Sequence, residues 1–113
     1  MVVNLLELVP VAKFPAKRTG EGLLRVEIPK FKGEIGKRFC QMFRLGEIIA
    51  VKLDEIGSFI YERCDGCRTV CNLLQEVKDE FGERIEPALP RVRSFLRSLE
   101  KNGLICFQSN IEH

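Results

Sequence analysis

Three cysteines lie close together in the middle of the chain. Cys64, Cys67 and Cys71 follow a C-x2-C-x3-C spacing. Zinc takes four ligands, for which Cys40 and Cys106 are the other cysteines, and a three-cysteine iron–sulfur cluster or a redox pair would use the same thiolates. The alternative is inert thiols, because a free cysteine usually behaves as a small apolar side chain. We favour inert thiols and expect no metal or cofactor.

The acidic residues and the histidine do not suggest an active site. Asp54 and Asp65 could form a carboxylate pair, but each stands where a helix start or a turn needs a hydrogen-bond acceptor. The single histidine, His113, is the last residue, where a positioned triad is not expected. We therefore expect a protein that is not an enzyme.

Length and composition favour one domain over residues 1–113. A hydrophobic content of 45% supports one compact core, and 18 basic against 16 acidic residues leave a net charge of only +2. No run reaches the roughly 18 apolar residues of a membrane span, and no signal peptide is visible. We expect a cytoplasmic protein with no membrane span and reduced cysteines.

The periodicity of apolar residues predicts strands followed by helices. Alternation predicts strands over 24–28 and 48–53, and three helices follow, with apolar stripes that begin near Ile56, Val70 and Val92. Short strands are also expected near each end of the chain, around 2–11 and 105–107. The caps are expected to be Asp54 and Thr69 at two helix starts, and Gly66, Gly82 and Gly103 at helix ends.

Residues 29–46 form a basic insert within this pattern. It carries five cations against one acid, namely Lys30, Lys32, Lys37, Arg38 and Arg44 against Glu34. Its apolar residues would share one side of a helix, namely Phe31, Ile35, Phe39, Met42 and Phe43. We interpret the insert as a loop or short helix that covers one side of the sheet; contact with a membrane or a nucleic acid is the alternative.

Charge is unevenly distributed over the three helices. Between Asp54 and Glu86 there are nine acidic and four basic residues, the wrong sign for a DNA-reading helix pair. The third helix is basic instead, with Arg91, Arg93, Arg97 and Lys101 against Glu100. A winged-helix nucleic-acid binder remains an alternative function, although we expect no nucleic-acid partner.

Four blocks of sequence together resemble the PqqD-like family, whose founding member assists synthesis of coenzyme PQQ. They are Leu53-Asp54-Glu55-Ile56-Gly57, Cys64-Asp65-Gly66-x-x-Thr69-Val70, a helix that ends in Phe81-Gly82, and Phe95-Leu96-x-x-Leu99-x-x-x-Gly103-Leu104-Ile105. The resemblance covers about 23–107. It implies an α+β fold, a small winged-helix-like domain with about three antiparallel strands followed by three helices.

The resemblance also implies a peptide-binding role. Relatives hold the leader of a ribosomally made precursor peptide for a modifying enzyme, often a radical S-adenosylmethionine protein, and the leader adds as a strand to the sheet edge beside the third helix. The residues that the resemblance assigns to this site are Ile48, Ile49, Ala50, Val51, Lys52, Leu53, Arg91, Val92, Phe95 and Leu99. The basic insert could cover that edge, and an exposed edge also leaves a homodimer by strand pairing open.

Overall fold

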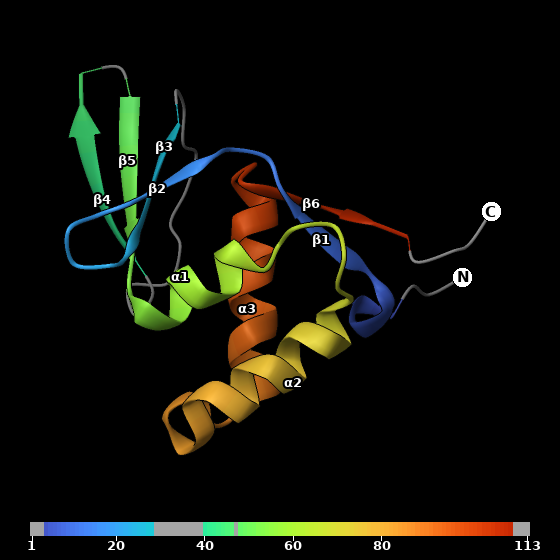
Figure 1. Cartoon of the computed structure of the whole chain (residues 1–113). Coiled ribbons are helices and arrows are strands. Elements are labelled where there is room, and N and C mark those ends of the chain that lie inside the picture. Colours follow the sequence, from blue (N-terminus) through green and yellow to red (C-terminus); the bar gives the residue numbers. More distant parts are fainter. Residues whose placement is uncertain (1–3, 29–39, 47, 110–113) are drawn as a thin grey trace.

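The computed structural model of the chain describes residues 4–28, 40–46 and 48–109 (Figure 1). Three α-helices follow five of the six strands. In chain order the elements are the 3-10 helix η1 (Leu5–Glu7), β1 (Val9–Ala12), β2 (Ala16–Arg18), β3 (Leu24–Ile28), β4 (Cys40–Leu45), β5 (Ile48–Leu53), α1 (Glu55–Glu62), α2 (Val70–Phe81), the 3-10 helix η2 (Gly82–Ile85), α3 (Ala88–Lys101) and β6 (Ile105–Gln108). The predicted α+β class, with antiparallel strands and three helices, is confirmed.

The larger sheet has four antiparallel strands in the order β2-β3-β5-β4. β3 and β5 form its centre, and Val26 pairs with Val51 and Ile28 with Ile49. Leu24, Val26 and Ile28 alternate with more exposed residues along β3, as the period of two requires. The apolar face of the two central strands therefore contributes to the core, where Val26, Val51 and Leu53 are fully buried.

Local capping fixes where the helices begin and end. The Asp54 carboxylate accepts a hydrogen bond of 2.7 Å from the Gly57 amide at the start of α1, and Thr69 forms a reciprocal capping box with Asn72 at the start of α2. After α3, Gly103 has φ +82 and the Leu104 amide donates to the Leu99 carbonyl over 2.9 Å. The predicted caps at Asp54, Thr69, Gly82 and Gly103 are confirmed, whereas the prediction for Gly66 is wrong, because α1 already ends at Glu62 with Arg63 as its C-cap and Gly66 lies in the turn that follows.

The N-terminal strand β1 lies between two distant parts of the chain. It pairs antiparallel with β6, with Val9 opposite Gln108 and Ala12 opposite Ile105. On its other side the Ala12 amide donates to the Cys64 carbonyl over 2.7 Å, and the Gly66 amide donates to the Pro10 carbonyl over 3.2 Å. The structure thus confirms short strands near both ends, with β1 bonded on both sides.

The second half of the basic insert differs from its sequence interpretation. Residues 40–45 form strand β4, which pairs with β5, and not part of a helix or loop. The spacing of Met42 and Phe43 fitted a helix, but pairing with β5 satisfies the backbone groups on one side of this segment and decides its conformation. Phe31, Ile35 and Phe39 lie outside the described residues.

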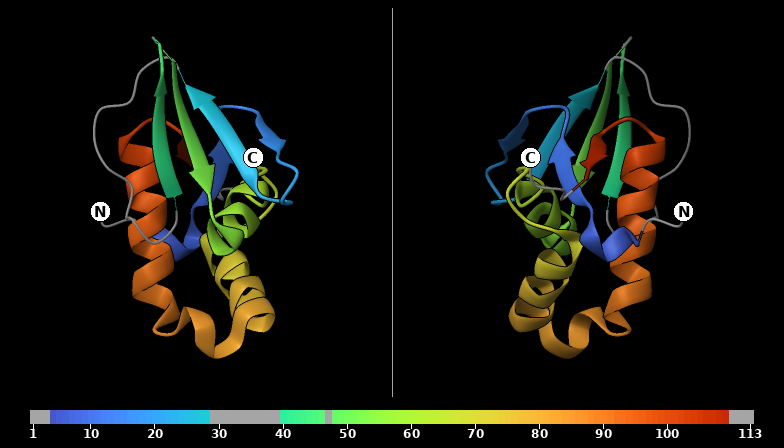
Figure 2. Two further views of the ribbon diagram at one scale, coloured as in Figure 1. Left: turned by 90° about the vertical axis from the view of Figure 1, so that its left-hand side faces the viewer. Right: turned by 90° about the vertical axis from the view of Figure 1, so that its right-hand side faces the viewer.

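The helices form the second layer of the domain. In Figure 2 the four-stranded sheet lies at one end of the molecule, while α2 and α3 extend away from it and are joined by η2 at the far end. Val92, Phe95, Leu96 and Leu99 of α3 are all buried, as their spacing predicts. No helix within the described ranges has both the length and the apolar character needed to cross a membrane.

Candidate functional site

Strand β5 contains six of the predicted peptide-binding residues, Ile48–Leu53. It is an inner strand of the sheet, paired with β3 over Ile49–Lys52 and with β4 along its whole length, from Leu53 opposite Cys40 to Ile48 opposite Leu45. β4 therefore occupies the edge at which a leader strand was expected to add. The reason is that only two residues separate Leu45 from Ile48 in the sequence, so β4 runs back along β5 as a hairpin.

The outer edge of the sheet is consequently the edge of β4. In an antiparallel hairpin closed by two residues, the flanking pair exchanges hydrogen bonds, and bonded pairs then alternate with non-bonded pairs. Leu45 and Ile48 are that flanking pair. It follows that the backbone groups of Cys40, Met42 and Arg44 point away from β5, toward the position of an additional strand.

Sequence reasoning did not identify this edge, although a signal was present. Gln41 to Leu45 was interpreted as part of the insert. However, a short apolar segment separated from a strongly predicted strand by two residues, the first of them Gly46, is typical of a β-hairpin. Gly46 adopts φ +67, the left-handed conformation that such connections use. The hairpin signal would have predicted β4.

The predicted groove residues on α3 are mostly in the core. Val92, Phe95 and Leu99 are 1%, 2% and 0% exposed, respectively, and belong to the main hydrophobic cluster. Arg91 is half-buried, on a flank of the helix. Three of the four side chains therefore present almost no surface to a ligand in this conformation, and a contact between α3 and a peptide stays a prediction centred on Arg91.

The three clustered cysteines have different surroundings. Cys64 is buried and its thiol donates to the Ile60 carbonyl over 3.3 Å, whereas Cys67 and Cys71 are exposed. Within the described residues, no group of three metal-ligating side chains converges. Asp65 accepts a hydrogen bond of 2.9 Å from the Cys67 amide and so shapes the turn between α1 and α2.

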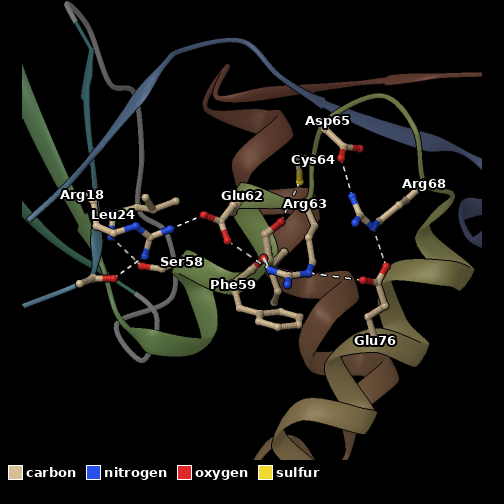
Figure 3. Close-up of polar contacts among 12 residues, drawn as sticks. Arg18, Leu24, Ser58, Phe59, Glu62, Arg63, Cys64, Asp65, Arg68 and Glu76 are labelled. Atoms are coloured by element: carbon tan, nitrogen blue, oxygen red, sulfur yellow. Dashed lines mark hydrogen bonds and ion pairs between the residues drawn. The ribbon is translucent and has the colours of Figure 1, made fainter.

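A polar cluster joins the sheet, α1 and α2 (Figure 3). The Arg63 guanidinium stacks 3.5 Å from the ring centroid of Phe59, and its Nε lies 3.4 Å from Oε1 of Glu76. Arg68 pairs with the same Glu76 carboxylate over 2.6 Å. Arg18 of β2 pairs with Glu62 of α1. These contacts are structural, because each charge is matched by a neighbour of opposite sign on another element.

Ser58 fixes the sheet to α1. Its hydroxyl accepts a hydrogen bond of 2.8 Å from the Leu24 amide at the start of β3, and it lies 3.4 Å from the Leu53 carbonyl at the end of β5, to which it donates. Both contacts are buried. The two central strands are thereby held in one position against the helices, which gives the sheet a fixed outer edge.

The buried Cys64 thiol makes stability depend on alkaline pH. Burial raises the pKa of Cys64 from an ordinary 9.0 to about 12, and the nearby Asp65 carboxylate adds to the increase. Above pH 9.0 the thiol ionises in the unfolded chain but stays protonated in the folded one, so the free energy of unfolding falls as pH rises. We expect a loss of about 1 kcal/mol between about pH 8 and about pH 10, measured by urea unfolding.

Variants separate this effect from general alkaline damage. Cys64→Ala removes the buried thiol and should flatten the pH dependence over this range. Cys71→Ala removes an exposed thiol and should keep the slope of the wild-type protein. A slope that persists in full in Cys64→Ala would contradict the assignment. Tyr61, whose pKa burial raises to about 12, adds a second loss at higher pH in both variants.

Comparison with known proteins identifies the family. The family described as coenzyme PQQ synthesis protein D (PqqD) matches residues 42–105, which run from the middle of β4 through the three helices to the first residue of β6. Comparisons with curated proteins and with solved structures found no match. The match covers more than half of the chain and includes every α-helix that the structure describes. The chain therefore belongs to the PqqD family, a family of small proteins associated with PQQ synthesis.

Proposed function

We propose that this protein is a non-catalytic module that binds the leader of a ribosomally made precursor peptide, and that the leader adds as a strand along β4. The proposal rests on the length and the residue types of β4, which forms that edge. β4 has six residues, CQMFRL, with one charge and no proline. Natural sheet edges are usually blocked by charges, prolines or short length, so an edge of this kind favours strand addition.

The opposite edge of the same sheet differs in each of these respects. β2 has only three residues, Ala16–Arg18, and two of them are cationic and exposed. Pro15 precedes it and lacks an amide hydrogen. Arg18 also pairs with Glu62 of α1, which ties this edge to the helices. Among the described residues, the β2 edge is therefore protected against pairing, whereas nothing pairs with the outer side of β4.

The predicted site residues keep a role in this arrangement. β5 (Ile48–Leu53) pairs with the inner side of β4, and β3 pairs with the other side of β5. Figure 2 shows β4 on the side of the sheet toward α3, and β3 on the side toward α1. A strand added to β4 would thus extend the sheet on its outer side. Arg91 lies in the first turn of α3, at the end away from the sheet, so we propose it as a partner for a carboxylate in a part of the leader that continues past β4.

Membership of the family supports our proposal of a separate partner enzyme. Asp54 acts as a helix cap whose pKa burial raises even though the Gly57 amide opposes the shift. A module that binds a leader without transforming it needs a separate catalyst. We assign that part to a radical S-adenosylmethionine enzyme, to which the bound leader would present its attached core peptide.

Backbone NMR tests the proposal directly. Isotope-labelled protein is titrated with a synthetic leader peptide encoded beside its gene, and with a scrambled peptide of equal composition as the control. We expect the amides of Met42 and Arg44 to shift more than those of Gln41 and Phe43, because the outward groups acquire new partners. Shifts confined to β2 or β6, or none with the native leader, would contradict strand addition at β4.

The same titration distinguishes addition from replacement. If the leader displaced β4 and paired with β5, the amides of Ile48, Ala50 and Lys52 would change partners and shift strongly. Under our proposal these three amides keep their bonds to β4 and shift little. The two modes therefore give different patterns along one hairpin.

A further inference from the structure

Three cations of α3 have no carboxylate within ion-pair distance among the residues that the structure describes. Five arginines elsewhere in that part of the chain lie within ion-pair distance of a carboxylate, namely Arg18, Arg25, Arg63, Arg68 and Arg84, whereas the exposed Lys13, Lys17 and Lys78 do not. No carboxylate among the described residues lies within that distance of Arg93, Arg97 or Lys101, and all three are exposed. These three side chains define what we call the α3 basic stripe.

The stripe lies along one face of the helix. Its residues are four positions apart, which places them on the side opposite the buried Val92, Phe95 and Leu99. At 1.5 Å per residue the stripe extends over about 12 Å. Leu89, four positions before Arg93 and 40% exposed, adds an apolar contact at its end. Helix α3 forms a margin of the molecule in both views of Figure 2.

A matching set of acids lies on the preceding elements. Asp79 and Glu80 at the end of α2 and Glu83 in η2 are exposed, and no cation among the described residues is within ion-pair distance of them. The Asp79 carboxylate accepts one hydrogen bond, of 3.0 Å, from Gln75 on its own helix. Lys78 is also exposed there, so this acidic set has an excess of two negative charges. We call it the α2 acidic set.

We infer that the α3 basic stripe of one molecule docks on the α2 acidic set of a second copy of this chain. The residues of each set are exposed on their own element, and no ion pair joins the two sets in the part of the chain that the structure describes. A second copy presents both a basic stripe and an acidic set, so it offers each set a partner of opposite charge. Arginine matches carboxylates with two parallel hydrogen bonds, which gives such a contact direction as well as attraction. This surface is separate from the β4 edge, so the inference does not depend on peptide binding.

Nucleic acid fits the stripe less well than a second copy does. Three phosphate contacts would supply only a small part of the electrostatic affinity that nucleic-acid binders use. The acidic set follows directly before α3 in the chain and would repel a phosphate backbone that extended beyond the stripe. A protein surface with a few carboxylates matches both the length and the sign of the stripe.

Charge exchange in the full-length protein tests the inference. Variant one carries Arg93→Glu and Arg97→Glu, and variant two carries Glu80→Lys and Glu83→Lys; all four sites are exposed, and the new residues are good helix formers. By sedimentation, we expect the wild type to self-associate at about 50 mM salt and to dissociate when added salt screens the charges. Each variant alone should associate at least about tenfold more weakly.

Mixing the two variants provides the decisive measurement. Variant one retains acids and variant two retains cations, so a mixture restores opposite charges at the contact and should recover association. A mixture that stays monomeric overturns the inference. Self-association of variant one that is as strong as that of the wild type also overturns it, because the molecules would then associate through another surface, such as a strand edge. A wild type that stays monomeric but binds duplex DNA, with variant one failing to bind, would assign the stripe to phosphate and also overturn it.

Discussion

Replacing Leu99 with alanine is expected to lower the free energy of unfolding by about 3 kcal/mol. The Leu99 side chain is completely buried in the cluster that joins α3 to the sheet and the other helices. Truncation removes apolar contacts and leaves a cavity that the surrounding elements cannot fill. Since small domains are stabilised by about 5–15 kcal/mol, the variant should unfold at clearly lower urea concentration, as measured by circular dichroism.

Leu89 gives the matched control on the same helix. It is 40% exposed, so Leu89→Ala removes the same atoms with little change in burial and should alter stability by less than about 0.5 kcal/mol. Equal losses in the two variants would show that Leu99 is not part of the core. The comparison also bears on peptide binding, because a binding defect in Leu99→Ala would have to be corrected for the unfolded fraction before Leu99 is counted as a contact.

Replacing Met42 with proline is expected to weaken leader binding by about tenfold or more. The Met42 amide points away from β5, and proline removes the amide hydrogen that an added strand would use, while leaving the hydrogen bonds between β4 and β5 in place. An edge strand tolerates proline at such a position. Isothermal titration with the synthetic leader measures the change in Kd.

Two further variants make the Met42 result interpretable. Met42→Ala shortens the side chain but keeps the amide, so it should bind much more tightly than Met42→Pro. Phe43→Pro removes an amide that bonds to β5, opposite Ala50, and should destabilise the hairpin itself. If Met42→Pro and Met42→Ala bind equally well, the outer edge of β4 does not receive the leader.

Features that depend on a few neighbouring residues were predictable from sequence. Asp54 and Thr69 cap helices through amides within three residues, and Gly103 turns the chain within one residue. The buried stripe of α3 was also predictable, because its spacing alone selects one face. These predictions succeed since each depends on the local backbone and not on which distant element lies beside it.

Features that depend on distant pairing were not predictable in the same way. The apolar residues of the insert fit a helix as well as a strand, and its pairing with β5 decided the conformation of Cys40–Leu45. Whether Val92 lines a groove or the core depends on how closely the sheet covers α3, which a helical period cannot show. The position of the candidate binding edge was missed for the same reason: it belongs to whichever strand happens to lie outermost.

The pairing of β1 with β6 has a consequence for synthesis on the ribosome. Val9 is synthesised almost a hundred residues before its partner Gln108. The Cys64–Gly66 turn becomes available to one side of β1 first, and the other side of β1 has no strand to pair with until Ile105–Gln108 is made. The pairing of β1 with β6 therefore forms only after the three helices between them have been synthesised, which makes it a long-range contact of the kind that forms slowly.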